Sequence, residues 1–151
     1  MLSNLADERD DDHPRLWLRF AEALGMEGGD VLAIEARPET GACVAAFSAA
    51  AQSSPLPFAF GMIYGYESQT PSVAATKIAG LRSHHGIEGE GLDYFKLHGK
   101  LDVKHAGELA EAISGLAEHP DDVAQAAEGA GRGAGAVWGL LDGVARARGL
   151  A

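Results

Sequence analysis

Apolar residues recur along most of the chain at spacings of three and four, which is the period of an amphipathic α-helix. No run of alternating Val, Ile or Thr indicates a strand, so the sequence predicts an all-α fold. The expected helices are Pro14–Leu24, a short piece between Gly29 and Arg37, Pro38–Ala51, a helix from about Leu92, and a last helix from His119–Pro120 to the basic "ARARG".

Two stretches of this pattern contain helix breakers. Residues from Ser54–Pro55 to about His84 are expected to form one long helix, bent where Pro71 removes a backbone donor. The carbonyl that loses its partner belongs to Glu67. The helix from Leu92 is expected to bend or restart around Gly107, and "EGAGRGAGAVWG" is interpreted as a closely packed helical surface.

Length and composition limit the possible classes. The 151 residues, of which 46% are hydrophobic, are expected to form a single domain over 1–151. Twelve basic and twenty-two acidic residues give a net charge of -10, so nucleic acid is not expected as a partner. No apolar run approaches the roughly 18 residues of a membrane span and no signal peptide is apparent, so a cytoplasmic location without membrane contact is expected.

Three ionisable residues interrupt the apolar face of "YFKLHGKLDVKHAGELAEAI". At about 100° per residue, His98, Asp102 and His105 fall within an arc of about 60°, on the face that also carries Phe95 and Leu109. A buried, unpaired carboxylate or imidazolium costs several kcal/mol. A divalent cation would compensate that cost, and imidazole with carboxylate is the donor set expected for iron, manganese or zinc in a helical bundle.

The alternative is that His98 and His105 are core histidines and that Asp102 holds one of them by a hydrogen bond. Three ligand-type residues on one arc favour the metal hypothesis, but one helix cannot surround an ion. Glu67 is the first candidate for a further carboxylate, because it lies in an apolar run one turn before Pro71. A solvated Glu67 at a helix edge is the other interpretation.

Three segments together resemble a known family. The segments "NLADE....HPRLWLRFAEALG", "YGYESQTPSVAATKIAGL" and "YFKLHGKLDVKHAGEL" resemble the haem-oxygenase-like diiron oxidases and oxygenases, in the superfamily of TenA and the pyrroloquinoline quinone synthase PqqC. The CADD-like branch, also described as iron-containing redox enzymes, is the most similar. The resemblance extends from about residue 3 to residue 145, and its most specific part is the His-x3-Asp-x2-His element.

The resemblance implies a function and a ligand set. It implies two Fe(II) ions, or manganese, and O2 as the co-substrate that oxidises a small organic substrate. It also implies Lys77 as a pocket residue, since some members carry a functional lysine on that helix. The implied metal ligands are Glu8, His13, Glu67, His98, Asp102 and His105.

Two departures from the family pattern leave other functions open. Glu8 and His13 are five residues apart, about 140° on a regular helix, so they must bridge a bend. The resemblance also implies helices before this point, so we expect an amino-terminally shortened form. The alternatives are a metal-free TenA-like or PqqC-like protein for a heterocyclic metabolite, and a non-catalytic interaction protein whose apolar surface is covered by another protein or by a second copy in a homodimer.

Overall fold

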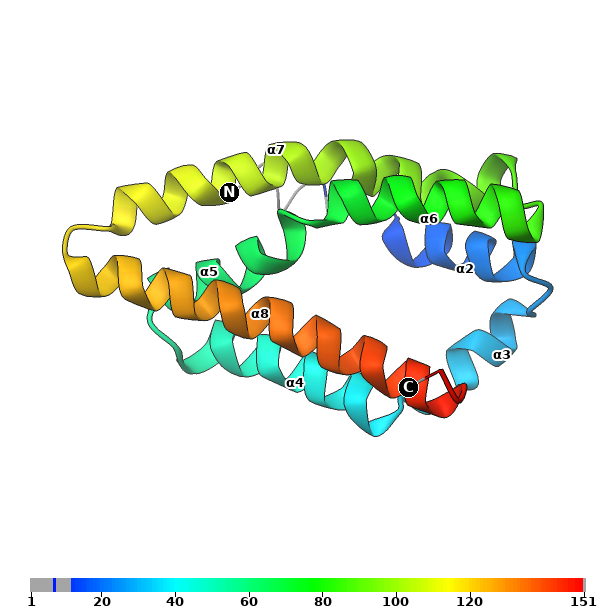
Figure 1. The fold of residues 1–151 in the computed structure, drawn as a ribbon, viewed down its shortest axis with the longest axis horizontal. Coiled ribbons are helices and arrows are strands. Elements are labelled where there is room, and N and C mark those ends of the chain that lie inside the picture. Colours follow the sequence, from blue (N-terminus) through cyan, green and yellow to red (C-terminus); the bar gives the residue numbers. More distant parts are fainter. Residues whose placement is uncertain (1–6, 8–11, 151) are drawn as a thin grey trace. The chain divides into compact units, whose positions relative to one another are not determined.

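The computed structural model describes residue 7 and residues 12–150, and every regular element among them is helical, which confirms the all-α prediction. None of the described helices is both long enough and apolar enough to cross a membrane. In chain order the elements are α2 (His13–Ala23), α3 (Gly28–Ala33), α4 (Pro38–Ser53), α5 (Leu56–Glu67), α6 (Thr70–His85), the 3-10 helix η1 (Gly89–Leu92), α7 (Asp93–Leu116) and α8 (Pro120–Ala147) (Figure 1).

Proline and glycine define several helix boundaries. Pro14, Pro38 and Pro120 lie in the first turns of α2, α4 and α8, where a missing N–H costs no helical hydrogen bond. Gly86 ends α6 in the left-handed conformation with φ 65°, which glycine adopts without steric cost. The backbone N–H of His119 donates to Asp122 Oδ2 at 3.0 Å, which caps the start of α8.

The structure differs from the sequence prediction at two places. The expected long bent helix is two helices, α5 and α6, which meet at Ser68 and Gln69. Pro71 therefore lies in the first turn of α6, where proline is tolerated, and not at a bend inside one helix. The second difference is that α7 continues through Gly107 without a break, because a single glycine costs a helix only about 1 kcal/mol.

The chain divides into two compact units. The first unit comprises 1–35 and 69–105, as far as these residues are described, and the second comprises 36–68 and 106–151. Helix α7 contributes its first part to the first unit and its second part to the second unit. The single domain expected over 1–151 stays a prediction.

Aromatic side chains pack against one another in the first unit, around the buried Phe95. Trp17 and Phe20 of α2 pack with their ring centroids 5.2 Å apart, and Phe20 packs edge-on against Phe95 at 4.9 Å. Trp17 also lies 5.0 Å from Tyr94, and Leu92 of η1 is fully buried. These contacts join α2 to η1 and to the start of α7, the helix that carries the histidines.

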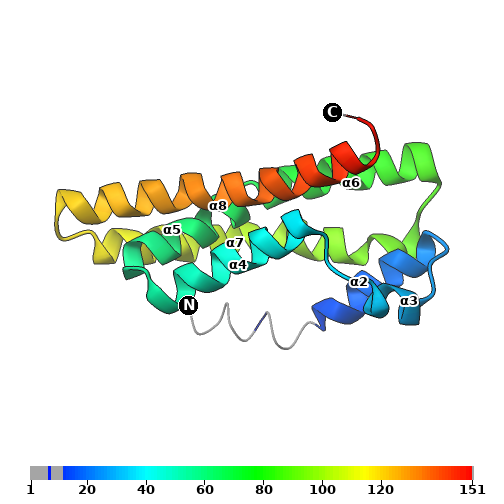
Figure 2. The same cartoon turned by 90° about the horizontal axis from the view of Figure 1, so that it is seen from below.

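Glycines allow α5 to pack closely against α8 in the second unit, in which α4 also lies beside α8 (Figures 1 and 2). A Cβ added at Gly61 of α5 would overlap the carbonyl of Ala126 in α8, and one added at Gly133 of α8 would overlap the carbonyl of Met62. Gly65 and Gly129 make equivalent contacts. The predicted closely packed surface is therefore confirmed for Gly129 and Gly133.

An ion pair joins α4 to the end of α8. Arg146 donates from Nη2 to Glu39 Oε1 at 3.3 Å, and the side chain of Glu39 packs against Gly143. A hydrogen bond from its own backbone, followed by the one from Arg146, holds the pKa of Glu39 below its ordinary value of 4.5.

The lowered pKa of Glu39 predicts a pH-dependent contribution to stability. Since the folded-state pKa is depressed, the contribution is present above about pH 4.5 and is lost as the pH falls through the folded-state value. Glu39→Gln should therefore lower the free energy of unfolding at pH 7 and have little effect near pH 3. Urea unfolding at both pH values measures this, with the exposed Glu111→Gln as the control. An equal effect of Glu39→Gln at both pH values would contradict the prediction.

Candidate metal site

Three polar side chains lie in the core on α7. His98, Asp102 and His105 are 7%, 2% and 0% exposed, as expected for residues on the apolar face of this helix. Phe95 and Leu109 on the same face are also buried. The amphipathic pattern that buries the apolar residues of α7 therefore also buries its two imidazoles and its carboxylate.

Asp102 orients His98. The distance from His98 Nδ1 to Asp102 Oδ1 is 3.1 Å. An ionised carboxylate only accepts hydrogen bonds, so this contact requires the proton on Nδ1, which in a neutral imidazole leaves the electron pair on Nε2. The second carboxylate oxygen, Asp102 Oδ2, is buried and has no hydrogen-bond partner among the described residues. A cation would satisfy this oxygen, so Asp102 has the chemistry of a metal ligand.

His13 brings a third imidazole to this cluster. It is the first residue of α2, and its ring centroid lies 4.7 Å from that of His98. The Tyr94 ring lies 4.5 Å from His98 and 6.5 Å from His13. Although 85 residues separate His13 from His98 in the chain, the packing of α2 against the start of α7 brings them together.

Asp7 is a residue of this cluster that the sequence analysis missed. Its Oδ2 accepts from Lys104 Nζ at 2.9 Å and lies 3.3 Å from His105 Nε2. The hydrogen bond from Lys104, and then the contact with His105, hold the pKa of Asp7 below its ordinary value of 3.8. Asp7 belongs to the run "DERDDD", in which no pattern distinguishes one carboxylate from the others.

The remaining predicted residues are not placed in this cluster. Glu67 is 8% exposed at the end of α5 and belongs to the second unit, whereas the histidines belong to the first. Glu8 lies outside the described residues. Within residue 7 and residues 12–150, no three His, Cys, Asp or Glu side chains form a group that could hold an ion. The six-residue ligand set therefore stays a prediction.

Lys77 lies on α6 and is exposed. Its ammonium nitrogen is 5.8 Å from the centroid of the Phe95 ring, a distance typical of a cation–π contact. Phe95 in turn packs edge-on against Tyr94, the ring that lies beside His98. A role for Lys77 in the chemistry stays a prediction.

Sequence comparison relates the chain to proteins of known family. A family model described as iron-containing redox enzyme matches residues 1–138. A 4-aminobenzoate synthase of Nitrosomonas europaea is 32% identical over 147 residues, which cover 95% of this chain and 60% of that protein. Proteins of the same name from Chlamydia pneumoniae and Chlamydia trachomatis are 34% and 33% identical, over 85% and 94% of this chain and 59% and 62% of theirs. The chain thus spans about three-fifths of the length of these relatives.

Proposed function

Because this chain belongs to the iron-containing redox enzyme family, we propose that it acts as a non-haem diiron oxidase or oxygenase, which uses O2 to oxidise a small organic substrate. One observation carries the proposal: two imidazoles and a carboxylate, which are common iron donors, are buried on one face of α7 beside a third imidazole from α2. Buried polar groups of this kind are stabilised when they coordinate a cation.

The proposed ligands combine the described cluster with two further carboxylates. Two Fe(II) ions, with manganese as the alternative, would be held by Glu8, His13, Glu67, His98, Asp102 and His105. Three carboxylates offset three of the four positive charges of two ferrous ions, which suits a buried site. Bound iron would supply the reductive activation of O2.

The described residues of the cluster have roles of their own. Asp102 fixes the ring of His98 through the contact at Nδ1, so that Nε2 is the donor atom. Asp7 holds His105 through Nε2, which makes Nδ1 the atom of His105 that would bind a cation. Tyr94 packs against His98 with the two ring centroids 4.5 Å apart, and this aromatic surface limits the access of water.

The names of the relatives suggest the first reaction product to test for. The matched proteins from Nitrosomonas and Chlamydia are named 4-aminobenzoate synthases, so we propose formation of 4-aminobenzoate as the activity to examine first. This proposal takes only the named reaction from the relatives, which are longer than this chain.

The experiment begins with iron. The full chain is loaded anaerobically with Fe(II), separated from free metal, and its iron content is measured by mass spectrometry. About two ions per chain are expected, and admission of O2 in the presence of a small-molecule cell extract, as the source of the organic substrate, should oxidise them and yield 4-aminobenzoate, detectable by liquid chromatography with mass spectrometry. Absence of tightly bound iron would refute the diiron proposal. Iron binding without formation of 4-aminobenzoate would refute only the proposed product.

The measurement of bound iron also distinguishes the diiron proposal from the metal-free alternative. A TenA-like or PqqC-like protein would use His98, Asp102 and His105 as acids, bases and hydrogen-bond donors, without iron. Such a protein would bind a heterocyclic ligand equally well before and after treatment with a chelator.

Substitution of Asp7 tests its role in positioning His105. Asp7→Ala removes the acceptor at His105 Nε2, and we expect the affinity for iron to fall about 10- to 100-fold, as for other residues that orient a metal ligand. Competition with a chelator of known affinity measures the change. Asp121→Ala, an exposed position at the start of α8, is the control. Unchanged iron affinity in Asp7→Ala would show that Asp7 only pairs with Lys104.

A further inference from the structure

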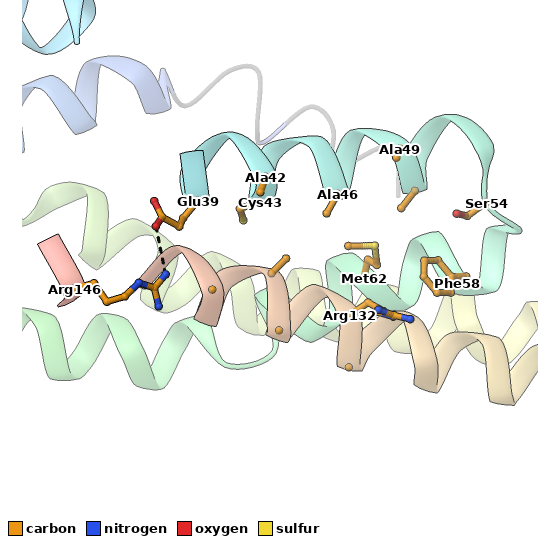
Figure 3. Close-up of a pocket in the computed structure, with 15 residues that line it drawn as sticks. Glu39, Ala42, Cys43, Ala46, Ala49, Ser54, Phe58, Met62, Arg132 and Arg146 are labelled. Atoms are coloured by element: carbon orange, nitrogen blue, oxygen red, sulfur yellow. Dashed lines mark hydrogen bonds and ion pairs between the residues drawn. The ribbon is translucent and has the colours of Figure 1, made fainter. Parts of the chain in front are cut away.

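The second unit contains a groove between α4 and α8. Its volume is about 780 Å³, within the range of roughly 300 to 1,000 Å³ that is usual for small-molecule sites. Phe58 and Met62 of α5 also line it (Figure 3). We call it the α4–α8 groove. All of its lining residues belong to the second unit, whereas the histidine cluster belongs to the first.

The α4–α8 groove is open because both walls carry very short side chains. The wall from α4 is mainly alanine, and the wall from α8 includes Gly131, Gly135 and Gly139. A Cβ added at any of these three glycines would meet no atom within 4 Å, in contrast to Gly129 and Gly133 of the same helix. Glycine destabilises a helix relative to alanine. Helix packing therefore does not account for the three glycines, whose effect is to widen the groove.

The charges along the groove favour an anionic ligand. Three charged residues line it, and Glu39 pairs with Arg146 at 3.3 Å. The third, Arg132, is 3.8 Å from Glu128 in an ion pair whose side chains are 72% and 61% exposed, which makes the pair weak. The lining thus has one net positive charge, in a chain whose net charge is -10.

We propose that the α4–α8 groove binds a planar, largely apolar organic anion. Rings fit between the flat alanine and glycine walls, where Phe58 and the Met62 sulfur make favourable contacts with aromatic surface. The anionic group pairs with Arg132, since a guanidinium binds carboxylate or sulfonate through two parallel hydrogen bonds. The proposal does not depend on iron, so its failure and that of the oxidase proposal are distinguishable.

A pair of fluorescent probes with the same rings tests the role of charge. The anion 1-anilinonaphthalene-8-sulfonate should bind the folded chain with micromolar affinity, about tenfold more tightly than the neutral N-phenyl-1-naphthylamine. Arg132→Gln should remove this preference and leave binding of the neutral probe unchanged. Arg148→Gln makes the same change of charge at an exposed position outside the lining and should keep the preference. Equal binding of both probes by the unmodified chain would overturn the proposal.

Filling the groove tests the location of the site. Gly135→Leu places a large side chain where no atom lies within 4 Å, so it should abolish binding of the anionic probe, whereas Gly135→Ala should retain most of it. Near-ultraviolet circular dichroism establishes that each variant keeps its packing, because partly folded chains also bind this probe. Retention of full binding by a folded Gly135→Leu variant would overturn the proposal.

The reactivity of the Cys43 thiol provides a second measurement of ligand binding, made within the groove itself. It is the only cysteine in the chain, it lines the groove, and burial raises the pKa of its thiol, so its reaction with iodoacetamide should be slow. The anionic probe should slow this reaction further. Competition then tests the planar shape, because 2-naphthoate should displace the probe at lower concentration than decanoate. Faster labelling in the presence of the probe, or stronger competition by decanoate, would contradict the proposal.

Discussion

Replacing His98 with alanine is expected to remove at least one of the two proposed iron ions. The substitution deletes an imidazole donor and also leaves Asp102 Oδ1 without the partner it has at 3.1 Å. A buried carboxylate that has lost its partner repels other anionic ligands and destabilises the site. The iron content of the chain after anaerobic loading measures the effect, with a fall from about two ions to one or none as the expected result.

The control for His98→Ala is His84→Ala. His84 is exposed in the last turn of α6, so its removal makes the same chemical change away from the candidate site and should leave the iron content unchanged. Asp102→Asn provides a second variant that keeps the shape of the side chain and removes its charge, and it should also lose iron. If both site variants fold and keep all their iron, the assignment of α7 as the ligand-bearing helix is wrong.

Replacing Gly133 with alanine is expected to destabilise the second unit strongly. The added Cβ would overlap the backbone carbonyl of Met62, and a backbone group cannot move aside as a flexible side chain can. Overpacking of this kind typically costs about 1 to 3 kcal/mol, and relaxation here requires α5 and α8 to separate. Urea unfolding followed by circular dichroism measures the loss, which should appear as a lower midpoint.

Gly135→Ala is the matched control, two residues further along α8. Its Cβ would meet nothing within 4 Å, so the variant should gain about 0.5 to 1 kcal/mol from helix propensity. The same substitution should therefore have opposite signs at the two positions. Equal effects at both positions would show that helix propensity, and not the approach of α5 to α8, sets the stability there.

The sequence predicts most helices because their signals are local. Apolar spacing and prolines in first turns are signals that lie within a few residues of the helix boundary that they predict. The junction at Ser68 and Gln69 was not predicted, because a proline near the middle of a long apolar pattern is compatible with a kink or with a new helix start. Which of the two forms depends on the packing of the flanking segments, and that information is not local.

The candidate site, like the fold, was predictable only where the signal is local. The burial of His98, Asp102 and His105 follows from the period of α7 alone. Periodicity does not link His13 to them, because the two segments are joined only by tertiary packing, and the family resemblance supplied that connection. Asp7 was missed because its contacts with His105 and Lys104 are likewise set by tertiary packing and not by local spacing.

The positions of the two tryptophans provide an intrinsic optical probe for each unit. Trp17 is 43% exposed and packs against the rings of Phe20 and Tyr94 in the first unit, whereas Trp138 is 61% exposed on α8 in the second. The emission of Trp17 should therefore shift to the red when the first unit melts, whereas Trp138 already emits largely from water. Spectra of Trp17→Phe and Trp138→Phe during heating would thus reveal whether the two units lose their structure together or in succession.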